Sequence, residues 1–324
     1  MKAIIWGSCG SLPSPTSSAT IRQKVKEAIW ASRELKFANI GAVDTYLETL
    51  PHSAHGTYKA NTTCVQIEAG TEEYIICDAG TGLRDFSLSL GKNAPPATYH
   101  IFVSHLHWDH IQGFPFFAPA YEQGNRIVFH GFHKTTESAI RAQMDAPYFP
   151  VSFEAMQADI EFDIQEDGAL FVVGDVQVAT IKQQHPGDSW GYSFKQGEKR
   201  IIFSSDSEHG PEASEEGYPF VDFLHKADVL IFDGQYTSEE ASEEKRYWGH
   251  SDHTTAVELA ARAKVRQLIV SHHEPAYSDP KIEEIHRAAL LYCKEYNKEL
   301  SQDIPAKNFP EHIKVAFDGL VIEA

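Results

Sequence analysis

Short apolar runs bounded by turn residues recur along most of the chain, and their length and alternation predict β-strands. Between them stand clusters of Gly, Ser, Asp and Pro, such as Ser8-Cys9-Gly10-Ser11 and the sharp turn Asp78-Ala79-Gly80-Thr81-Gly82. Two apolar segments joined by Asp318-Gly319 predict a closing hairpin over residues 314–317 and 320–322. The other predicted strands are residues 2–7, 63–67, 74–77, 99–104, 126–130, 177–181, 192–195, 200–204, 229–232 and 267–271.

Helical periodicity is clearest over residues 254–264 and 282–297. Residues 14–60 interrupt the strand pattern, and we predict there a helical insertion with helices over 20–37 and 42–50. Its first helix places Ile21, Val25, Ala28 and Ile29 on one stripe, which predicts packing against the body of the protein. We interpret the insertion as a cap or edge decoration near a functional site, with an RNA-binding arm and a dimer contact as alternatives. The basic residues that keep the RNA alternative open are Arg22, Lys24, Lys26, Arg33 and Lys36.

Strands interspersed with helices favour an α+β fold in which two sheets pack together with helices outside. The 324 residues suffice for a large core, and we expect one domain over 1–324 with the insertion at 14–60. A hydrophobic share of 42% and a charged share of 23% are typical of globular proteins. No apolar run is long enough for a membrane helix, and the start reads as a strand, so we expect no membrane association and a cytoplasmic location.

The four cysteines, Cys9, Cys64, Cys77 and Cys293, are scattered and predict buried small side chains rather than disulfides or a thiolate metal site. The formal net charge of −18 disfavours an extended nucleic acid as a partner. It remains compatible with a small anionic substrate held by metal ions, because local charge decides that interaction.

The segment Ser104-His105-Leu106-His107-Trp108-Asp109-His110 places four metal-binding side chains at the end of a predicted strand. Imidazole suits zinc and related transition metals, and carboxylate can complete such a site. Three further candidates each follow an apolar stretch, and each could by itself be an ordinary loop residue. Strand ends that converge on one edge can build one site from distant residues. These later candidates are His185, Asp206 and His272.

This H-x-H-x-D-H pattern with a later His, Asp and His resembles the metallo-β-lactamase superfamily over nearly the whole chain outside residues 14–60. The resemblance implies a four-layer αββα sandwich and two divalent metal ions, best matched by zinc, with manganese or iron as alternatives. By that resemblance His105, His107 and His185 hold one metal. Asp109, His110 and His272 hold the other, and Asp206 bridges the two.

The residues around these positions resemble the ribonuclease Z and cyclic-nucleotide phosphodiesterase branch of the superfamily. A carboxylate stands at Asp206, where dinuclear β-lactamases commonly use cysteine. The segments 233–237 and 248–256 match the branch in order, and by that resemblance His250 reaches the phosphate. Asp252-His253 departs from the simplest pattern, which makes His253 a rival. The candidate catalytic residues are therefore His250 and Asp109.

We predict a dinuclear metal-dependent hydrolase, a phosphodiesterase for a small substrate such as a cyclic nucleotide. Two such metal ions activate water and stabilise the attacking and leaving oxygens of an in-line displacement. Asp78 is a candidate acceptor for the N–H of a ligand histidine, with a turn-forming role as the alternative. For His273 we favour a role without chemistry over one in contact with a ligand residue or the substrate. Alternatives are a thioesterase or lactone hydrolase, a tRNA 3′-processing endonuclease, and a non-catalytic metal-binding module. No conspicuously basic arm lies between His110 and Asp206, and the family's habit suggests a homodimer.

Overall fold

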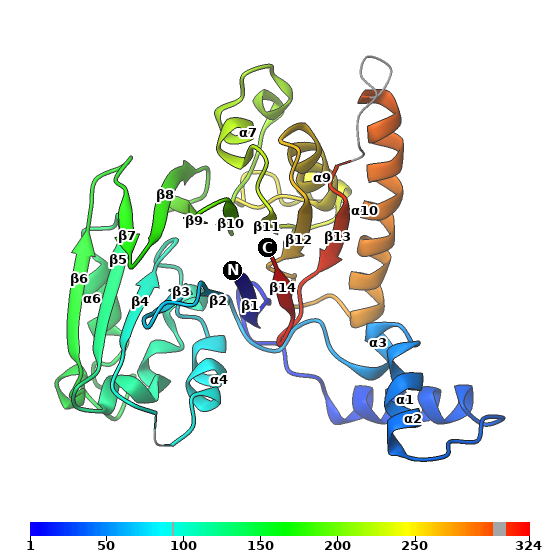
Figure 1. Ribbon diagram of the computed structural model, residues 1–324, viewed down its shortest axis with the longest axis horizontal. Helices are drawn as coiled ribbons and strands as arrows, with labels where there is room; N and C mark the ends of the chain where they lie inside the picture. Colours follow the sequence, from blue (N-terminus) through cyan, green and yellow to red (C-terminus); the bar gives the residue numbers. More distant parts are fainter. Residues whose placement is uncertain (93, 301–308) are drawn as a thin grey trace.

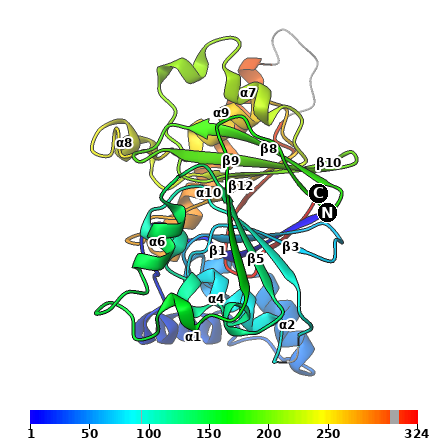
Figure 2. The ribbon, with the colours of Figure 1, turned by 90° about the vertical axis from the view of Figure 1, so that its left-hand side faces the viewer.

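Two β-sheets packed face to face form the centre of the protein, and helices cover their outer faces (Figures 1 and 2). The computed structural model describes residues 1–92, 94–300 and 309–324. In this part of the chain each sheet has seven strands, and the two chain ends lie close together (Figure 1). The predicted strands outside the closing hairpin all coincide with strands of the structure, within a few residues at their ends.

The first sheet has the order β14-β1-β2-β3-β4-β5-β6. The β14, β1, β2 and β3 strands pair antiparallel, whereas β3, β4, β5 and β6 pair parallel. The bounds are β1 (Lys2–Gly7), β2 (Cys64–Glu68), β3 (Tyr74–Cys77), β4 (Thr98–Phe102), β5 (Arg126–Gly131), β6 (Asp159–Ile164) and β14 (Val321–Glu323).

The second sheet has the order β13-β12-β11-β10-β9-β8-β7. It is parallel from β13 to β10 and antiparallel from β10 to β7. The bounds are β7 (Phe171–Val173), β8 (Val176–Gln183), β9 (Ser189–Gln196), β10 (Lys199–Ser204), β11 (Val229–Asp233), β12 (Gln267–Ser271) and β13 (His312–Val315).

Three apolar clusters hold the layers together. Between the sheets, Phe102 of the first sheet packs with Tyr192 and Phe194 of the second. A second cluster joins the outer face of the second sheet to α7, α9 and α10, and a third joins the outer face of the first sheet to α4 and α6. This arrangement confirms the αββα sandwich. The helices of the body are α4 (Gly82–Ser89), α5 (Trp108–Ile111), α6 (Thr136–Ala142), α7 (Pro219–Leu224), α8 (Ser238–Ser242), α9 (His253–Arg262) and α10 (Asp279–Leu300), and the 3₁₀ helices are Phe114–Phe116, Ala118–Tyr121, Phe153–Ala155 and Pro211–Ser214.

Residues 14–60 contain α1 (Ser18–Ala31), α2 (Ile40–Glu48) and α3 (His52–His55), which extend away from the two sheets (Figure 1). We call residues 14–60 the helical insertion. The expectation that its apolar stripe packs against the body is wrong, because neither α1 nor α2 contains a buried residue. The insertion is instead anchored at α10 by a polar and an apolar contact, since Lys24 Nζ donates to Asp279 Oδ2 at 2.5 Å and the buried Tyr58 packs with Ile282 and Val315.

The predicted closing hairpin is also wrong. The β13 strand pairs parallel with β12 in the second sheet, whereas β14 pairs antiparallel with β1 in the first. Between them the chain crosses from one sheet to the other, and Gly319 N donates to the carbonyl of Ile5. Each strand thereby extends an existing ladder and buries an apolar side chain, Val315 or Ile322, which a separate two-stranded ribbon could not do.

All four cysteines are free and buried, as predicted. Across the described residues, no helix has both the length and the apolar character needed to cross a membrane.

Candidate metal centre

The candidate ligands lie in segments that follow strands of both sheets, and two of them, Asp109 and His110, are in the short helix α5. His105, His107, Asp109 and His110 follow β4 of the first sheet. The other three follow strands of the second sheet: His185 follows β8, Asp206 follows β10 and His272 follows β12. The structure brings all seven side chains to one place between the sheet edges, and only His107 among them is exposed.

The seven side chains form two adjacent groups that share Asp206. Ligand atoms of His105, His107, His185 and Asp206 all lie within 4.8 Å of one another. Asp109, His110 and His272 form the second group within the same limit. Asp206 therefore stands between the groups, with its two oxygens turned to different sides.

The distances show how Asp206 faces both groups. Its Oδ2 lies 3.6 Å from Nε2 of His105 and 3.6 Å from Nε2 of His185. Its Oδ1 lies 3.2 Å from Nε2 of both His110 and His272. Asp109 Oδ2 lies 3.3 Å from the same two histidine nitrogens. A carboxylate in this position can bridge two cations.

Hydrogen bonds on the outer ring nitrogens fix three of the imidazoles. His110 Nδ1 donates to Asp78 Oδ2 at 2.7 Å, as the predicted role of Asp78 requires. His185 Nδ1 donates to the carbonyl of Gly249 at 2.8 Å, and His272 Nδ1 lies 3.1 Å from Gln235 Oε1. Donation through Nδ1 leaves the Nε2 lone pair directed inward, which is the arrangement of metal-ligating histidines.

The inner nitrogens themselves support a metal at this place. Among the described residues, Nε2 of His105 and Nε2 of His110 are buried and find no hydrogen-bond partner. A buried polar atom without a partner is costly, and convergent imidazoles with a carboxylate match the ligands that zinc and related divalent ions prefer. The donor set therefore fits a divalent metal centre.

Backbone strain accompanies two candidate ligands and one supporting carboxylate that follow strands. Asp206 has φ 47°, His272 has φ 61° and Asp78 has φ 60°, all in the left-handed region that non-glycine residues rarely adopt. Such strain persists where the surrounding structure holds it, and it concentrates at functional sites.

Burial, followed by the neighbouring His110, holds the pKa of His105 well below its ordinary value and so keeps this imidazole neutral. Burial also lowers the pKa of His110, but Asp206, Asp109 and Asp78 outweigh it and raise that pKa well above the usual range. Negative charge is thus concentrated around the second group, where a bound cation would be balanced.

His250 forms a third candidate metal group with Asp206 and His272, whose ligand atoms all lie within 4.8 Å of one another, and it is oriented by Asp233. Its Nδ1 donates to Asp233 Oδ2 at 2.9 Å and lies 3.9 Å from Asp206 Oδ2. Its ring stacks on His272, with centroids 5.1 Å apart. Burial lowers the pKa of His250, but Asp233 and then Asp206 raise it to about 9.

His253, the rival of His250, and His273 have surroundings different from those of His250. His253 is the first residue of α9, and it belongs to none of the candidate metal groups among the described residues. His273 Nε2 hydrogen bonds to the carbonyl of Ala316, which ties the last ligand loop to the chain that follows β13.

Sequence reasoning gave no role to Gln235, Asp233 or the Gly249 carbonyl, although each positions a histidine of the site. Gln235 and Asp233 both lie in the segment 233–237 that marked the branch, so their place in that motif was the available signal. Every residue has a backbone carbonyl, so the residue type at Gly249 could not identify it as the acceptor for His185.

Comparison with known proteins agrees with this geometry. The family model described as "Beta-lactamase superfamily domain" matches residues 73–273. A Ribonuclease Z from Oceanobacillus iheyensis is 24% identical over 235 residues, which cover 57% of this chain and 74% of the relative. A Ribonuclease Z from Clostridium perfringens is 23% identical over 258 residues, covering 64% of this chain and 81% of the relative.

Solved structures share the fold at low sequence identity. The metallo-β-lactamase fold protein YhfI from Bacillus subtilis superposes with a TM-score of 0.64 and 14% identity, over 100% of this chain and 98% of the other. The short form of human tRNase Z gives a TM-score of 0.57 and 16% identity, and the superposition covers 100% of this chain and 99% of tRNase Z. Unliganded yeast PDE1 gives a TM-score of 0.60 and 15% sequence identity, and the superposition covers 99% of this chain and 98% of PDE1.

These relatives correct one expectation. The net charge of −18 was taken to disfavour an extended nucleic acid as a partner, but the curated relatives are ribonucleases and a structural neighbour is named tRNase Z. The inference failed because net charge averages over the whole surface, whereas a phosphodiester meets only the local charge of the site and its rim.

The family model covers well over half of the chain, and the fold and the geometry of the His/Asp groups agree with it. The chain therefore belongs to the metallo-β-lactamase superfamily.

Proposed function

We propose that this chain is a metal-dependent phosphodiesterase that cleaves RNA, with the 3′ end of precursor transfer RNA as its substrate. The observation that carries the proposal is the position of His250, held by Asp233 and facing the carboxylate shared by the two ligand groups. The names of the curated relatives support RNA as the substrate class.

His105, His107, His185 and Asp206 would hold one divalent ion, and Asp109, His110, His272 and Asp206 a second. Zinc matches this donor set best, and manganese and iron also accept it. When bound, such ions supply Lewis acidity and lower the pKa of water. Asp78 and Gln235 keep His110 and His272 in the tautomer that presents Nε2 to the centre.

His250 would act on the phosphate as a proton or hydrogen-bond donor. Asp233 accepts from Nδ1, so the proton on Nε2 is the one available to the leaving oxygen of a phosphodiester. Asp109 accepts from the backbone N–H of Ser11 at 2.7 Å, which fixes its carboxylate toward His110 and His272. A positioned general acid of this kind typically contributes roughly 10²- to 10⁴-fold in rate.

The test is cleavage of a precursor transfer RNA with a 3′ trailer by the zinc- or manganese-loaded protein, followed on a denaturing gel. We expect release of the trailer and a loss of about 10²-fold or more in His250→Ala. His253→Ala is the matched control and should retain cleavage. The proposal is wrong if the metal-loaded protein leaves the precursor intact.

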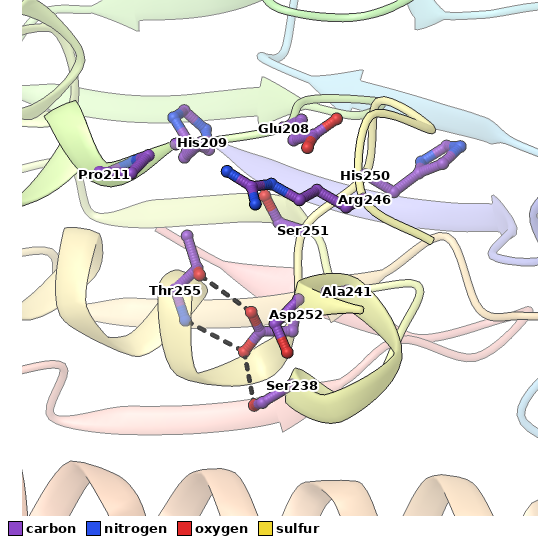
Figure 3. Close-up of a pocket in the computed structure, with 12 residues that line it drawn as sticks. Glu208, His209, Pro211, Ser238, Ala241, Arg246, His250, Ser251, Asp252 and Thr255 are labelled. Atoms are coloured by element: carbon purple, nitrogen blue, oxygen red, sulfur yellow. Dashed lines mark hydrogen bonds between the residues drawn. The ribbon is translucent and has the colours of Figure 1, made fainter. Parts of the chain in front are cut away.

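A small phosphodiester such as a cyclic nucleotide is a second candidate. The specific observation that favours it is a cavity of about 280 Å³ lined by His250, Arg246 and Ser251 (Figure 3). This volume lies near the lower end of the range for small-molecule sites, roughly 300–1,000 Å³. Hydrolysis of 2′,3′- and 3′,5′-cyclic AMP, compared with a thioester substrate, separates this candidate from the thioesterase alternative.

A further inference from the structure

Two exposed aromatic residues precede His250, the histidine beside the metal centre, with only Gly249 between them and it. Tyr247 is 69% exposed and Trp248 is 54% exposed, and both follow the basic pair Lys245-Arg246. Large aromatic side chains are among the residues that proteins usually cover, so two in succession at the rim of a site require an explanation. We call residues 245–248 the aromatic loop.

The aromatic loop is held in place rather than loosely attached. Glu208 accepts two hydrogen bonds at 2.9 Å, from the N–H of Tyr247 on Oε1 and from the N–H of Gly249 on Oε2. Tyr247 has φ 69°, a left-handed conformation that costs a non-glycine residue free energy. The two hydrogen bonds to Glu208 therefore hold Tyr247 in a strained backbone conformation.

The same loop is joined directly to the metal centre. The Gly249 carbonyl, next to Trp248 in the chain, accepts from the candidate ligand His185 at 2.8 Å. His185 Nε2 in turn lies 3.0 Å from His107 Nδ1. Trp108, which follows His107 in the chain, is a further exposed aromatic side chain at 67%. Exposed aromatic residues thus lie next in the chain to residues of the site on both sheets.

Each ring of the aromatic loop has a cation near it. Lys245 Nζ lies 3.9 Å from the ring centroid of Trp248, and Arg246 Cζ lies 4.9 Å from that of Tyr247. More than half of each aromatic side chain remains open to solvent. Arg246 also lines the cavity beside His250, as Figure 3 shows. The loop therefore offers flat apolar surface together with local positive charge in a chain of net charge −18.

We infer that the aromatic loop is a nucleobase subsite, in which Trp248 and Tyr247 stack against the base of the nucleotide next to the scissile phosphate. Aromatic rings interleaved with cations are the combination that binds single-stranded nucleic acids, because every base has a π-face and every linkage an anionic phosphate. This inference rests on the proposed phosphodiesterase function and adds that the substrate is recognised through a base.

The test is equilibrium binding rather than turnover. The metal-loaded full-length protein is titrated in a calorimeter with 5′-AMP and with ribose 5-phosphate, which carries the same phosphate without a base. Base–aromatic stacking of about 1–3 kcal/mol corresponds to an affinity ratio of roughly 5- to 150-fold in favour of AMP. We expect Trp248→Leu to abolish most of that ratio and Tyr247→Leu to reduce it.

Trp30→Leu is the matched control, because Trp30 is an exposed tryptophan on the helical insertion, at 69% against 54% for Trp248. It should keep the wild-type ratio, and circular dichroism checks that each variant is folded. Equal affinity of the wild type for the two ligands, or an unchanged ratio in both Trp248→Leu and Tyr247→Leu, overturns the inference. A preference for AMP without cleavage of any phosphodiester would instead refute the proposed function and leave the base subsite standing.

Discussion

The metal centre and the helical insertion differ in how the rest of the protein covers them. Six of the seven candidate ligands are buried, and hydrogen bonds to other parts of the chain fix the outer nitrogens of three of them, His110, His185 and His272. In the insertion, α1 and α2 contain no buried residue and expose their apolar stripe. The comparison teaches that a cluster of metal-binding residue types in the sequence predicts a buried site, whereas an apolar stripe on a helix does not predict which surface packs against it.

Substitution of the shared carboxylate should have the largest effect. Asp206→Ala removes the atoms that face both ligand groups, so we expect metal content to fall below that of the wild type. Phosphodiesterase activity should fall by more than the roughly 10- to 100-fold typical of outer hydrogen-bonding partners. Elemental analysis and hydrolysis assays measure both. Asp44→Ala, at an exposed carboxylate of the insertion, should match the wild type, and full metal content in Asp206→Ala would refute the bridging role.

A methyl group added at Gly249 should have the next largest effect. A Cβ there would lie 2.3 Å from His185 Nδ1, and the φ of +88° strains any other residue. We expect Gly249→Ala to displace His185 and to weaken metal binding by roughly 10- to 100-fold, measured by competition with a chelator. Gly41→Ala in α2, where a Cβ meets only Asn39 Oδ1 at 3.4 Å, should change neither property. Equal metal affinity in the two variants would contradict this account.

The same contrast explains what the sequence could predict. His105 to His110 lie in one motif, and His185, Asp206 and His272 each follow an apolar strand, so residue type and position predicted the convergence of these side chains that the structure shows. The outer partners depend on backbone carbonyls and on loops folded over the site, as at Gly249. The pairing of β13 and β14 with different sheets depends on ladders formed far away in sequence, which a local turn signal at Asp318-Gly319 cannot report.

A buried histidine away from the metal centre should give a smaller, pH-dependent effect. Burial, opposed in part by Asp163, lowers the pKa of His130 to about 4, and His100 lies against its other nitrogen at 2.8 Å. Because the folded pKa lies below the ordinary value of about 6.5, this group's contribution to stability is complete above pH 6.5 and is lost as the pH falls toward 4.

We expect the loss at His130 to amount to about 2–3 kcal/mol of unfolding free energy. Urea unfolding of the wild type and of His130→Gln at pH 7 and pH 5 measures it, since the difference between the two proteins should shrink at the lower pH. A difference that is independent of pH would show that His130 does not titrate in this way.

The smallest effect is expected in the insertion, where the stripe is exposed. Ile29 is 65% exposed and Trp30 is 69% exposed, so Ile29→Ser with Trp30→Ser should change the unfolding free energy by less than about 0.5 kcal/mol. Metal content should be unchanged, because the insertion supplies none of the candidate ligands. Light scattering on the same protein tests the predicted homodimer, for which these side chains are available. If the double variant converts a dimer into a monomer, a second copy of the chain covers this surface of the insertion in solution. The metal centre is then covered by its own chain, whereas the insertion is covered by the partner copy.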